Sequence, residues 1–276
     1  MGLMDRITPT FYEQTGFGCP GIRALVLGRS GTDRISFMTL HLAERVVLPF
    51  SDRVDAGWEL GRFVLSEARL LGIEPSALLV CGLPRGGVIV AAEVSRELGA
   101  TLCVLPARKL GAPGNPELAI GAVSVVGDPY LTPSARALAD EEWIQAEVAT
   151  QRRRISEQLA KFGESDLQAR VKDRTVLVVD DGTATGATAA AACQACWALG
   201  AYDVWVAVPV APPEALRLLQ NYASEVFCLA AREDFQAVGM WYMDFSQTSD
   251  EEVLKALEAS RRAGGGEAAS ESTGRG

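Results

Sequence analysis

The stretch VLVVDDGTATGAT, from Val176 to Thr188, constrains this chain more than any other. Its four leading apolar residues are typical of a strand that is buried on both faces of a parallel sheet. Two adjacent carboxylates, Asp180 and Asp181, follow where that strand should end, and a loop of small and hydroxylated residues leads into an alanine-rich helix. Backbone N–H groups at the start of a helix suit a phosphate, and the carboxylates can accept hydrogen bonds from vicinal hydroxyls. The stretch therefore predicts a sugar-phosphate site.

A second unit of strand, loop and helix precedes this stretch. The residues ALLVCG, from Ala77 to Gly82, predict a short buried strand, and the residues from Val88 to Leu98 predict a helix. Between them lie Arg85, Gly86 and Gly87. The arginine can bind a phosphate through two N–H groups, and the glycines let the backbone approach a ligand closely. An ordinary turn with a surface arginine is the alternative interpretation.

The stretch from Val176 to Thr188 resembles the 5-phosphoribosyl-1-pyrophosphate (PRPP) motif of the type I phosphoribosyltransferases. That motif has four apolar residues, two acidic residues and a small loop that ends in Thr-Gly-x-Thr, here Thr185 to Thr188. Other segments are similar to one bacterial subfamily of these enzymes whose acceptor is generally unassigned. These segments are VVLPFSDRVDAGWELG, CGLPRGGVIVAAEVSRELGA, ARKLGAPGNPELAIGAV and WYMDFSQTSDEEV. The resemblance extends from about Val47 to Leu257.

The resemblance implies an α/β fold, a doubly wound parallel sheet with helices on both faces and a small hood on the acceptor side. The ligand is expected at the carboxyl ends of the strands, where the loops 82–87 and 180–188 meet. The expected phosphoribosyltransferase domain spans residues 46–260. Residues 1–45 are expected to form a loosely ordered extension without a periodic pattern, and the Gly-, Ser- and Glu-rich residues 261–276 a disordered tail.

The resemblance also implies a reaction, the Mg²⁺-dependent displacement of pyrophosphate from C1 of PRPP by an unidentified acceptor. It assigns the ribose hydroxyls to Asp180 and Asp181, which would contribute to Mg²⁺ binding mostly through PRPP and water. The 5-phosphate is expected on the loop formed by Gly182, Thr183, Ala184, Thr185, Gly186, Ala187 and Thr188. Pyrophosphate is expected at Arg85, Gly86, Gly87, Arg108 and Lys109, in a loop that often contains a non-proline cis peptide. The expected catalytic residues are Asp180, Asp181, Arg108, Lys109 and Arg85.

Residues 110–121, LGAPGNPELAIG, are rich in glycine and proline and follow an expected strand. Such a composition is typical of a mobile loop, and the family has a loop here that closes over the reacting centre. Glu117 either orders this lid or is a solvated carboxylate.

The acceptor side is expected after the last strands, with Phe235, Trp241, Tyr242 and Asp244 as its lining. A packed aromatic cluster under the carboxyl-terminal helix is the alternative. Family members that salvage 6-oxopurines carry an aspartate at the fifth loop position, which is Ala184 here. Adenine-type members have a small residue there, so adenine or a non-purine nucleophile is expected to be a better acceptor than hypoxanthine or guanine.

Composition excludes several other classes of protein. The net charge of −9 and the sequence pI near 4.8 argue against general nucleic-acid binding. No apolar run reaches the roughly 18–20 residues of a membrane span, and no signal-like start is present, so a cytoplasmic protein without a membrane partner is expected. A homodimer is also expected.

Cysteine and histidine usage argue against a metal or redox site. The pair Cys193 and Cys196 lies in a helical pattern, where buried reduced thiols are favoured over redox or metal use. A single histidine, His41, leaves no histidine-rich metal site and no Ser-His-Asp triad in the core.

A second functional hypothesis is a regulatory protein that binds PRPP or a nucleotide without turning it over, because a fold does not fix a function. The lid and the basic pyrophosphate residues favour an enzyme.

Overall fold

The structure is a computed structural model that describes residues 22–29, 35–164 and 166–265. Its main sheet has seven strands in the order β1-β2-β10-β9-β8-β3-β4. All neighbouring strands pair in parallel except β1 and β2, which are antiparallel. The strands are β1 (Ile22–Arg29), β2 (Ile35–Leu42), β3 (Leu79–Gly82), β4 (Thr101–Val104), β8 (Thr175–Val179), β9 (Asp203–Ala211) and β10 (Glu225–Ala231).

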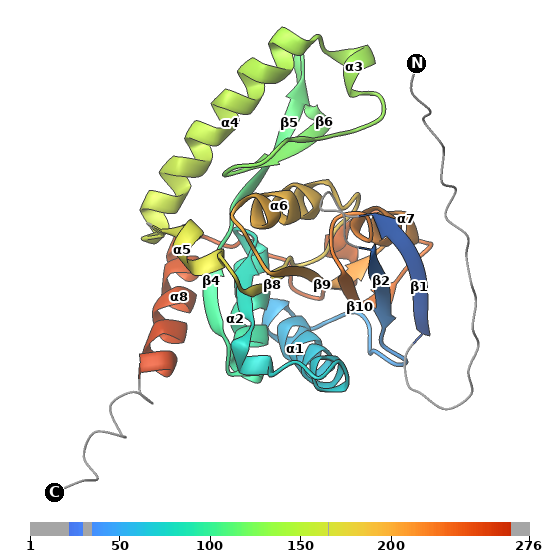
Figure 1. The fold of residues 1–276 in the computed structure, drawn as a ribbon, viewed down its shortest axis with the longest axis vertical. Coiled ribbons are helices and arrows are strands. Elements are labelled where there is room, and N and C mark those ends of the chain that lie inside the picture. Colours follow the sequence, from blue (N-terminus) through green and yellow to red (C-terminus); the bar gives the residue numbers. More distant parts are fainter. Residues whose placement is uncertain (1–21, 30–34, 165, 266–276) are drawn as a thin grey trace, which may run out of the picture.

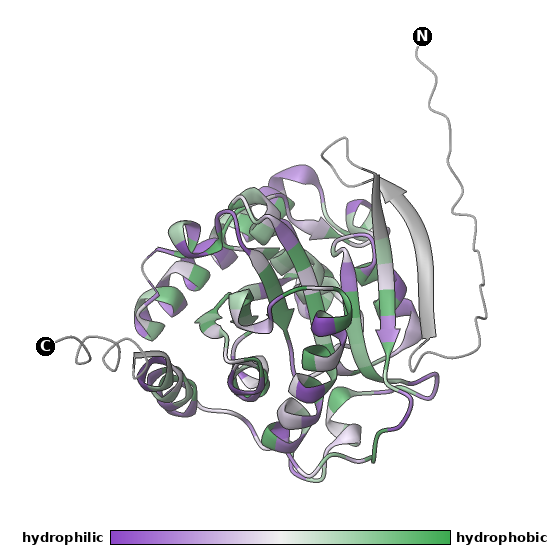
Figure 2. Ribbon diagram, turned by 60° about the horizontal axis from the view of Figure 1, so that its bottom comes forward, coloured by the Kyte–Doolittle hydropathy of each residue, from purple (hydrophilic) through white to green (hydrophobic). Residues whose placement is uncertain are grey.

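Helices cover both faces of this sheet (Figure 1). One face carries α1 (Arg53–Leu70), α2 (Gly86–Leu98) and α8 (Asp250–Gly265), and the other carries α6 (Ala187–Ala198) and α7 (Pro213–Leu219). Alternate residues of the central strands supply the two cores: Leu177 packs with the first group of helices, and Val178 with the second. Figure 2 shows that the inner strands are mostly apolar, whereas apolar and polar residues alternate along the surrounding helices. The predicted doubly wound α/β fold is confirmed.

A third layer lies beyond α6 (Figure 1). It contains a three-stranded antiparallel sheet of β5 (Ala107–Ala112), β6 (Asn115–Ser124) and β7 (Tyr130–Leu131). The connections that follow are α3 (Ala135–Leu138), α4 (Glu141–Phe162) and α5 (Leu167–Val171). Helix α4 packs against this sheet, and Asp140 caps its amino end by accepting a hydrogen bond from the Trp143 N–H at 2.8 Å.

Residues 110–121, predicted as a mobile loop, form most of the β5–β6 hairpin, so this segment has regular strand structure. Its closure over the site stays a prediction. Leu110 and Ile120 are fully buried in the same core cluster as Ile144 of α4, and this burial stabilises the strands despite the glycines and prolines. The register shifts on both sides of Gly111, where a β-bulge lets the hairpin accommodate the irregular sequence.

The prediction of a loosely ordered segment up to residue 45 also needs correction. Strands β1 and β2 belong to the main sheet, and β2 pairs with β10. His41 of β2 is buried, with its Nδ1 2.7 Å from the Glu67 carboxylate and its Nε2 2.6 Å from the Glu225 carboxylate. These contacts join β2 to α1 and β10. Residues 1–21 lie outside the described part of the chain.

At the other end, α8 continues to Gly265, so the first five residues of the expected tail are helical and residues 266–276 lie outside the description. Two short 3₁₀ helices, η1 (Pro75–Ala77) and η2 (Val238–Trp241), complete the elements described. No described helix is both long and apolar enough to cross a membrane.

Candidate functional site

The candidate site forms where β3 and β8 lie side by side in the main sheet, with β4 as the edge strand beyond β3. The two strands are parallel, and Gly82 at the end of β3 is in register with Val179 at the end of β8. From β3 the chain passes to α2 on one face, and from β8 it passes to α6 on the other. Because the chain leaves toward opposite faces, the two loops open a crevice at the carboxyl ends of the strands. The predicted meeting of the loops 82–87 and 180–188 is confirmed.

Two glycines of the first loop pack directly on the two aspartates of the second. A Cβ atom at Gly86 would lie 1.9 Å from Oδ2 of Asp181, and one at Gly87 would lie 2.8 Å from Oδ1 of Asp180. Any larger residue would therefore displace the carboxylates. The peptide between Pro84 and Arg85 is cis, as the resemblance implies.

The paired carboxylates are partly buried, and their environment favours proton binding. Burial, followed by the charge of Asp181, raises the pKa of Asp180 well above its usual value. Burial also raises the pKa of Asp181, although the Arg53 guanidinium acts in the opposite direction. The N–H of Asp181 donates to Oδ1 of Asp180 at 3.0 Å. The pair can accept further hydrogen bonds from the hydroxyls of a ligand.

The loop after the carboxylates is held by its own hydroxyls. Thr183 Oγ1 accepts a hydrogen bond from the Gly186 N–H at 2.9 Å, and Thr185 Oγ1 accepts one from the Ala187 N–H at 3.3 Å. Gly186 caps α6 with a φ of +76°, which suits glycine. Ala184 and Thr185 are exposed. The loop thus opens to solvent at the positive end of a helix dipole, as a phosphate site requires.

Arg53, the first residue of α1, is a site residue that the sequence reasoning missed. Its Nε donates to Oδ2 of Asp181 at 2.7 Å, and its Nη1 donates to the carbonyl oxygen of Ser246 at 2.8 Å. Its guanidinium also lies 3.9 Å from the centre of the Phe245 ring. The segment VVLPFSDRVDAGWELG, which resembles the bacterial subfamily, contains this arginine, but its pattern does not indicate a role in the site.

Comparison with known proteins agrees with this geometry. The family model described as "Phosphoribosyl transferase domain" matches residues 62–244, which include both loops. The chain belongs to the phosphoribosyltransferase family.

Relatives within this family include two proteins from two strains of Mycobacterium tuberculosis, each named "Putative phosphoribosyl transferase". Each is 40% identical over 218 residues, which make up 77% of this chain. The chain spans about half, 47%, of the length of these relatives. The solved structure of the protein TT1426 from Thermus thermophilus is 43% identical, with a TM-score of 0.61, and the match covers 76% of this chain and 98% of TT1426.

The residues expected to bind pyrophosphate in this member of the family come from two elements. Arg85 occupies the position before α2, and its guanidinium lies 3.9 Å from the carboxylate of Asp250 at the start of α8. The same carboxylate is 2.6 Å from Nζ of Lys161. Arg85 is more than a third exposed and can reach an anion at the mouth of the crevice.

The structure separates Arg108 from Lys109, although both were assigned to pyrophosphate. Arg108 Nε donates to Gln151 Oε1 of α4 at 2.8 Å, so this side chain faces α4. Lys109 is exposed and is the cross-strand partner of Ala122, which packs against Ala187 at the start of α6. Cross-strand partners share a face, so Lys109 lies on the face of the hairpin that is turned toward the start of α6. Glu117 is exposed near the hairpin tip.

The residues expected on the acceptor side divide into two groups. Phe235 and Trp241 are partly exposed, with their rings stacked 6.4 Å apart, and Arg232 lies 4.6 Å from the centre of the Trp241 ring. Tyr242 is buried, and its hydroxyl donates to the backbone oxygen of Asp181 at 2.5 Å. Tyr242 therefore supports the loop after β8, and its ring packs with the rings of Phe50 and Phe245.

Among the contacts of the described residues, none joins the Asp244 carboxylate to the residues of the two loops. This carboxylate is exposed and accepts a hydrogen bond from the Ser246 N–H at 2.9 Å, which lowers the pKa of Asp244. Its contribution is to the local turn that carries Phe245 and Ser246.

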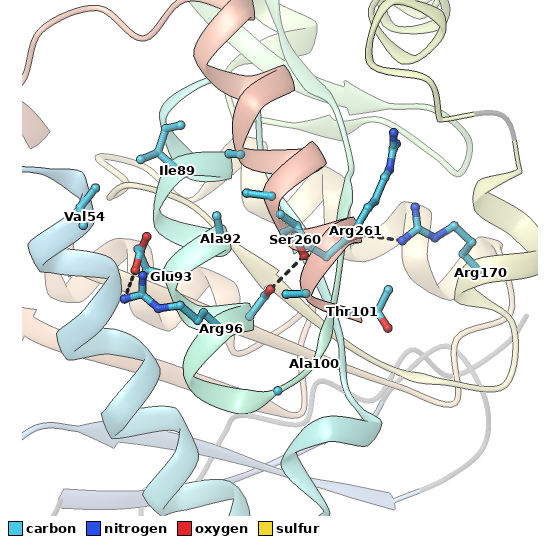
Figure 3. A pocket seen from close by; sticks show the side chains of 16 residues that line it. Val54, Ile89, Ala92, Glu93, Arg96, Ala100, Thr101, Arg170, Ser260 and Arg261 are labelled. Atoms are coloured by element: carbon cyan, nitrogen blue, oxygen red, sulfur yellow. Dashed lines mark hydrogen bonds and ion pairs between the residues drawn. The ribbon is translucent and has the colours of Figure 1, made fainter. Parts of the chain in front are cut away.

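Other features lie outside the two loops of this site. Cys193 and Cys196 are free and buried, as predicted, and burial raises the pKa of both thiols. A pocket of about 900 Å³ lies between α2 and α8 beside Thr101, at the amino end of β4 (Figure 3). Its lining extends from Val54 of α1, the neighbour of Arg53, along α2 and α8 to Thr101 and Arg170.

Proposed function

We propose that this chain transfers a phosphoribosyl group from PRPP to a nucleophilic acceptor, with release of pyrophosphate. The observation that carries this proposal is the packing of Gly86 and Gly87 against Asp181 and Asp180 beside the amino end of α6. This packing supports the proposal because it places hydrogen-bond acceptors for a diol next to Arg85 and to the amino end of α6, two groups that favour anions. The names of the Mycobacterium tuberculosis relatives support the same class of reaction.

Each part of PRPP has a matching group in this proposal. The loop from Thr183 to Thr188 binds the 5-phosphate through backbone N–H groups and hydroxyls. Asp180 and Asp181 accept hydrogen bonds from the two ribose hydroxyls. Arg85 and Lys109, with the backbone at Gly86, bind pyrophosphate.

Mg²⁺ is the metal that the family implies, and the donor set fits it. Mg²⁺ is commonly held by one or two carboxylates together with substrate phosphates, and Asp180 and Asp181 present adjacent carboxylates. Among the described residues, no group of three or more His, Cys, Asp or Glu side chains forms a separate metal site. The ion would therefore be shared with PRPP and water. When bound, it would offset the charge of the diphosphate.

The chain's own residues act mainly by positioning and by stabilising charge. The bond between C1 of the ribose and the pyrophosphate oxygen breaks, and its electron pair leaves with pyrophosphate. The acceptor then forms a bond to C1 and loses a proton to solvent or a nearby base. Arg85 and Lys109 stabilise the negative charge that grows on the leaving group, while the two aspartates fix the ribose.

A pyrophosphate-release assay with a panel of nucleobases, amines and sugars tests this proposal. Purified protein with Mg·PRPP is expected to release pyrophosphate only with a suitable acceptor. The double variant Asp180→Asn, Asp181→Asn serves as the matched control and should be inactive. Tight PRPP binding without release for any acceptor would support a PRPP-sensing regulator instead. Absence of PRPP binding would contradict both the transferase and the PRPP-sensing regulator.

A further inference from the structure

The guanidinium of Arg53 is held by three contacts, one of which is with a carboxylate oxygen of Asp181. Its Nε donates to Oδ2 of that residue at 2.7 Å, and its Nη1 donates to the Ser246 carbonyl at 2.8 Å. The Phe245 ring closes one face of the guanidinium, with its centre 3.9 Å from the Arg53 Cζ. The side chains of Arg53 and Asp181 are only 12% and 15% exposed. Three simultaneous contacts leave the guanidinium little freedom to turn away.

Gly86 closes the remaining space around the same oxygen. Its Cβ position lies 1.9 Å from Oδ2 of Asp181 and 2.5 Å from Nε of Arg53. Oδ2 is therefore enclosed by the arginine and the glycine, which leaves Oδ1, on the side of Asp180, as the oxygen that we assign to the ligand.

The groups that hold Arg53 belong to the segment on the acceptor side. The N–H groups of Met243 and Asp244 donate to the carbonyl oxygens of Phe50 and Ser51 at 2.7 and 3.0 Å. The Tyr242 hydroxyl, from the same segment, donates to the backbone oxygen of Asp181 at 2.5 Å. Segment 242–246 thus reaches Asp181 twice, directly through Tyr242 and indirectly through Arg53.

We propose that Arg53 is a positioning residue that orients Asp181 toward the ribose and couples PRPP binding to segment 242–246. This inference rests on the proposed function, because it takes PRPP as the ligand. Without Arg53, Asp181 would carry a second free oxygen beside the like charge of Asp180, and its side chain would rotate away from that charge. With Arg53 in place, one oxygen is held and the other is presented in a fixed direction.

A double-mutant cycle in Mg·PRPP binding, measured by calorimetry, separates this role from a general structural one. Arg53→Ala should weaken binding about 10-fold or more, the scale of one charge-assisted hydrogen bond. In the Asp181→Asn background the same change should have little further effect, because Arg53 acts through that carboxylate. Arg53→Lys keeps the charge and should recover part of the affinity. Arg62→Ala removes an exposed arginine of α1 that stacks on Trp58, and it is the matched control.

Several results would overturn the inference. Wild-type affinity in Arg53→Ala, or an equal loss in both backgrounds, would show that Arg53 does not act through Asp181. If Arg53→Ala fails to fold, as judged by thermal unfolding, the comparison of Arg53→Lys and Arg53→Gln in both backgrounds decides the question. No PRPP binding by the wild-type chain would instead overturn the proposed function, and this inference with it.

The coupling to the acceptor side has its own readout in backbone amide exchange. Mg·PRPP should slow the exchange of residues 242–246 in the wild-type chain, and it should do so less in Arg53→Lys because the stacking and the bond to Ser246 are weakened. Equal protection in both proteins would contradict the coupling.

Discussion

The backbone of Gly86 touches the Asp181 carboxylate so closely that a Cβ atom would lie 1.9 Å from Oδ2. The loop 82–87 and the paired carboxylates of Asp180 and Asp181 are therefore one packed unit, although the two residues come from loops after different strands. This contact explains why the loop needs glycine: a side chain would occupy the place of the carboxylate oxygen.

Gly86→Ala should lower the affinity for Mg·PRPP at least about 10-fold, since it displaces Asp181 and Arg53 together. Overpacking should also cost about 1–3 kcal/mol of unfolding free energy. Gly72→Ala is the control. Gly72 lies just past the far end of α1 with a φ of +73° and nothing within 4 Å of its Cβ position, so alanine should cost stability alone. Calorimetry and urea unfolding check both variants, and normal PRPP affinity in Gly86→Ala would contradict the packing argument.

Lys109→Ala should lower kcat about 10²-fold while weakening PRPP binding much less, because the charge on the leaving group grows in the transition state. Arg108→Ala should lower kcat less, since Arg108 faces Gln151 of α4. Steady-state kinetics and calorimetry on the two variants make the comparison. A larger loss of kcat in Arg108→Ala than in Lys109→Ala would mean that Arg108, and not Lys109, is the residue of the hairpin that acts on the leaving group.

Asp180→Asn should stabilise the protein at pH 8, by about 0.5–2 kcal/mol, while abolishing tight PRPP binding. Burial and the charge of Asp181 raise the pKa of Asp180 above its unfolded value. When the pH is above the pKa of Asp180 in the folded state, the charged carboxylate lowers the free energy of unfolding. This loss disappears when the pH falls below the pKa of Asp180 in the unfolded state, about 3.9. The gain from asparagine should accordingly shrink as the pH falls from 8 to about 4.

Urea unfolding with a chelator present, at both pH values, measures this gain. Asp234→Asn provides the opposite case, because the hydrogen bond from Arg232 lowers the pKa of Asp234, and its removal should not stabilise the protein at pH 8. Lower stability of Asp180→Asn than of the wild type at pH 8 would show that the charge of Asp180 does not destabilise the folded protein.

Hypoxanthine and guanine should be poor acceptors compared with adenine or a non-purine nucleophile. Ala184 occupies the loop position at which 6-oxopurine enzymes carry an aspartate, and it is exposed at the loop tip without a side-chain hydrogen-bonding group. General acid–base assistance is worth about 10²–10⁴-fold in rate, so a competition assay can detect its absence. Efficient conversion of either 6-oxopurine to its nucleotide would refute the interpretation of Ala184.

The centre of the fold could be predicted because its signal is local. The apolar run before Asp180 and the small loop after Asp181 specify strand, turn and helix within a few residues. The adjacency of β3 and β8 followed from the resemblance and from the strand order that the doubly wound fold requires.

The rest of the site depends on contacts between distant residues. Arg53 and Asp181 are separated by 128 positions, and no periodic pattern indicates which side chain at the start of α1 reaches the loop after β8. The β5–β6 hairpin was missed because glycine and proline are rare in strands, whereas burial of Leu110 and Ile120 against α4 outweighs that tendency. Strand β2 owes its place to pairing with β10 rather than to its own composition.

The most direct test of the account is the affinity of Mg·PRPP for the wild-type chain and for Asp181→Asn, measured by calorimetry under identical conditions. The account predicts one binding site per chain in the wild type and a loss of about 1.5–3 kcal/mol in the variant, the scale of one charge-assisted hydrogen bond. Equal affinity in the two proteins, or no binding by the wild type, would contradict the assignment of the ribose to the acidic pair.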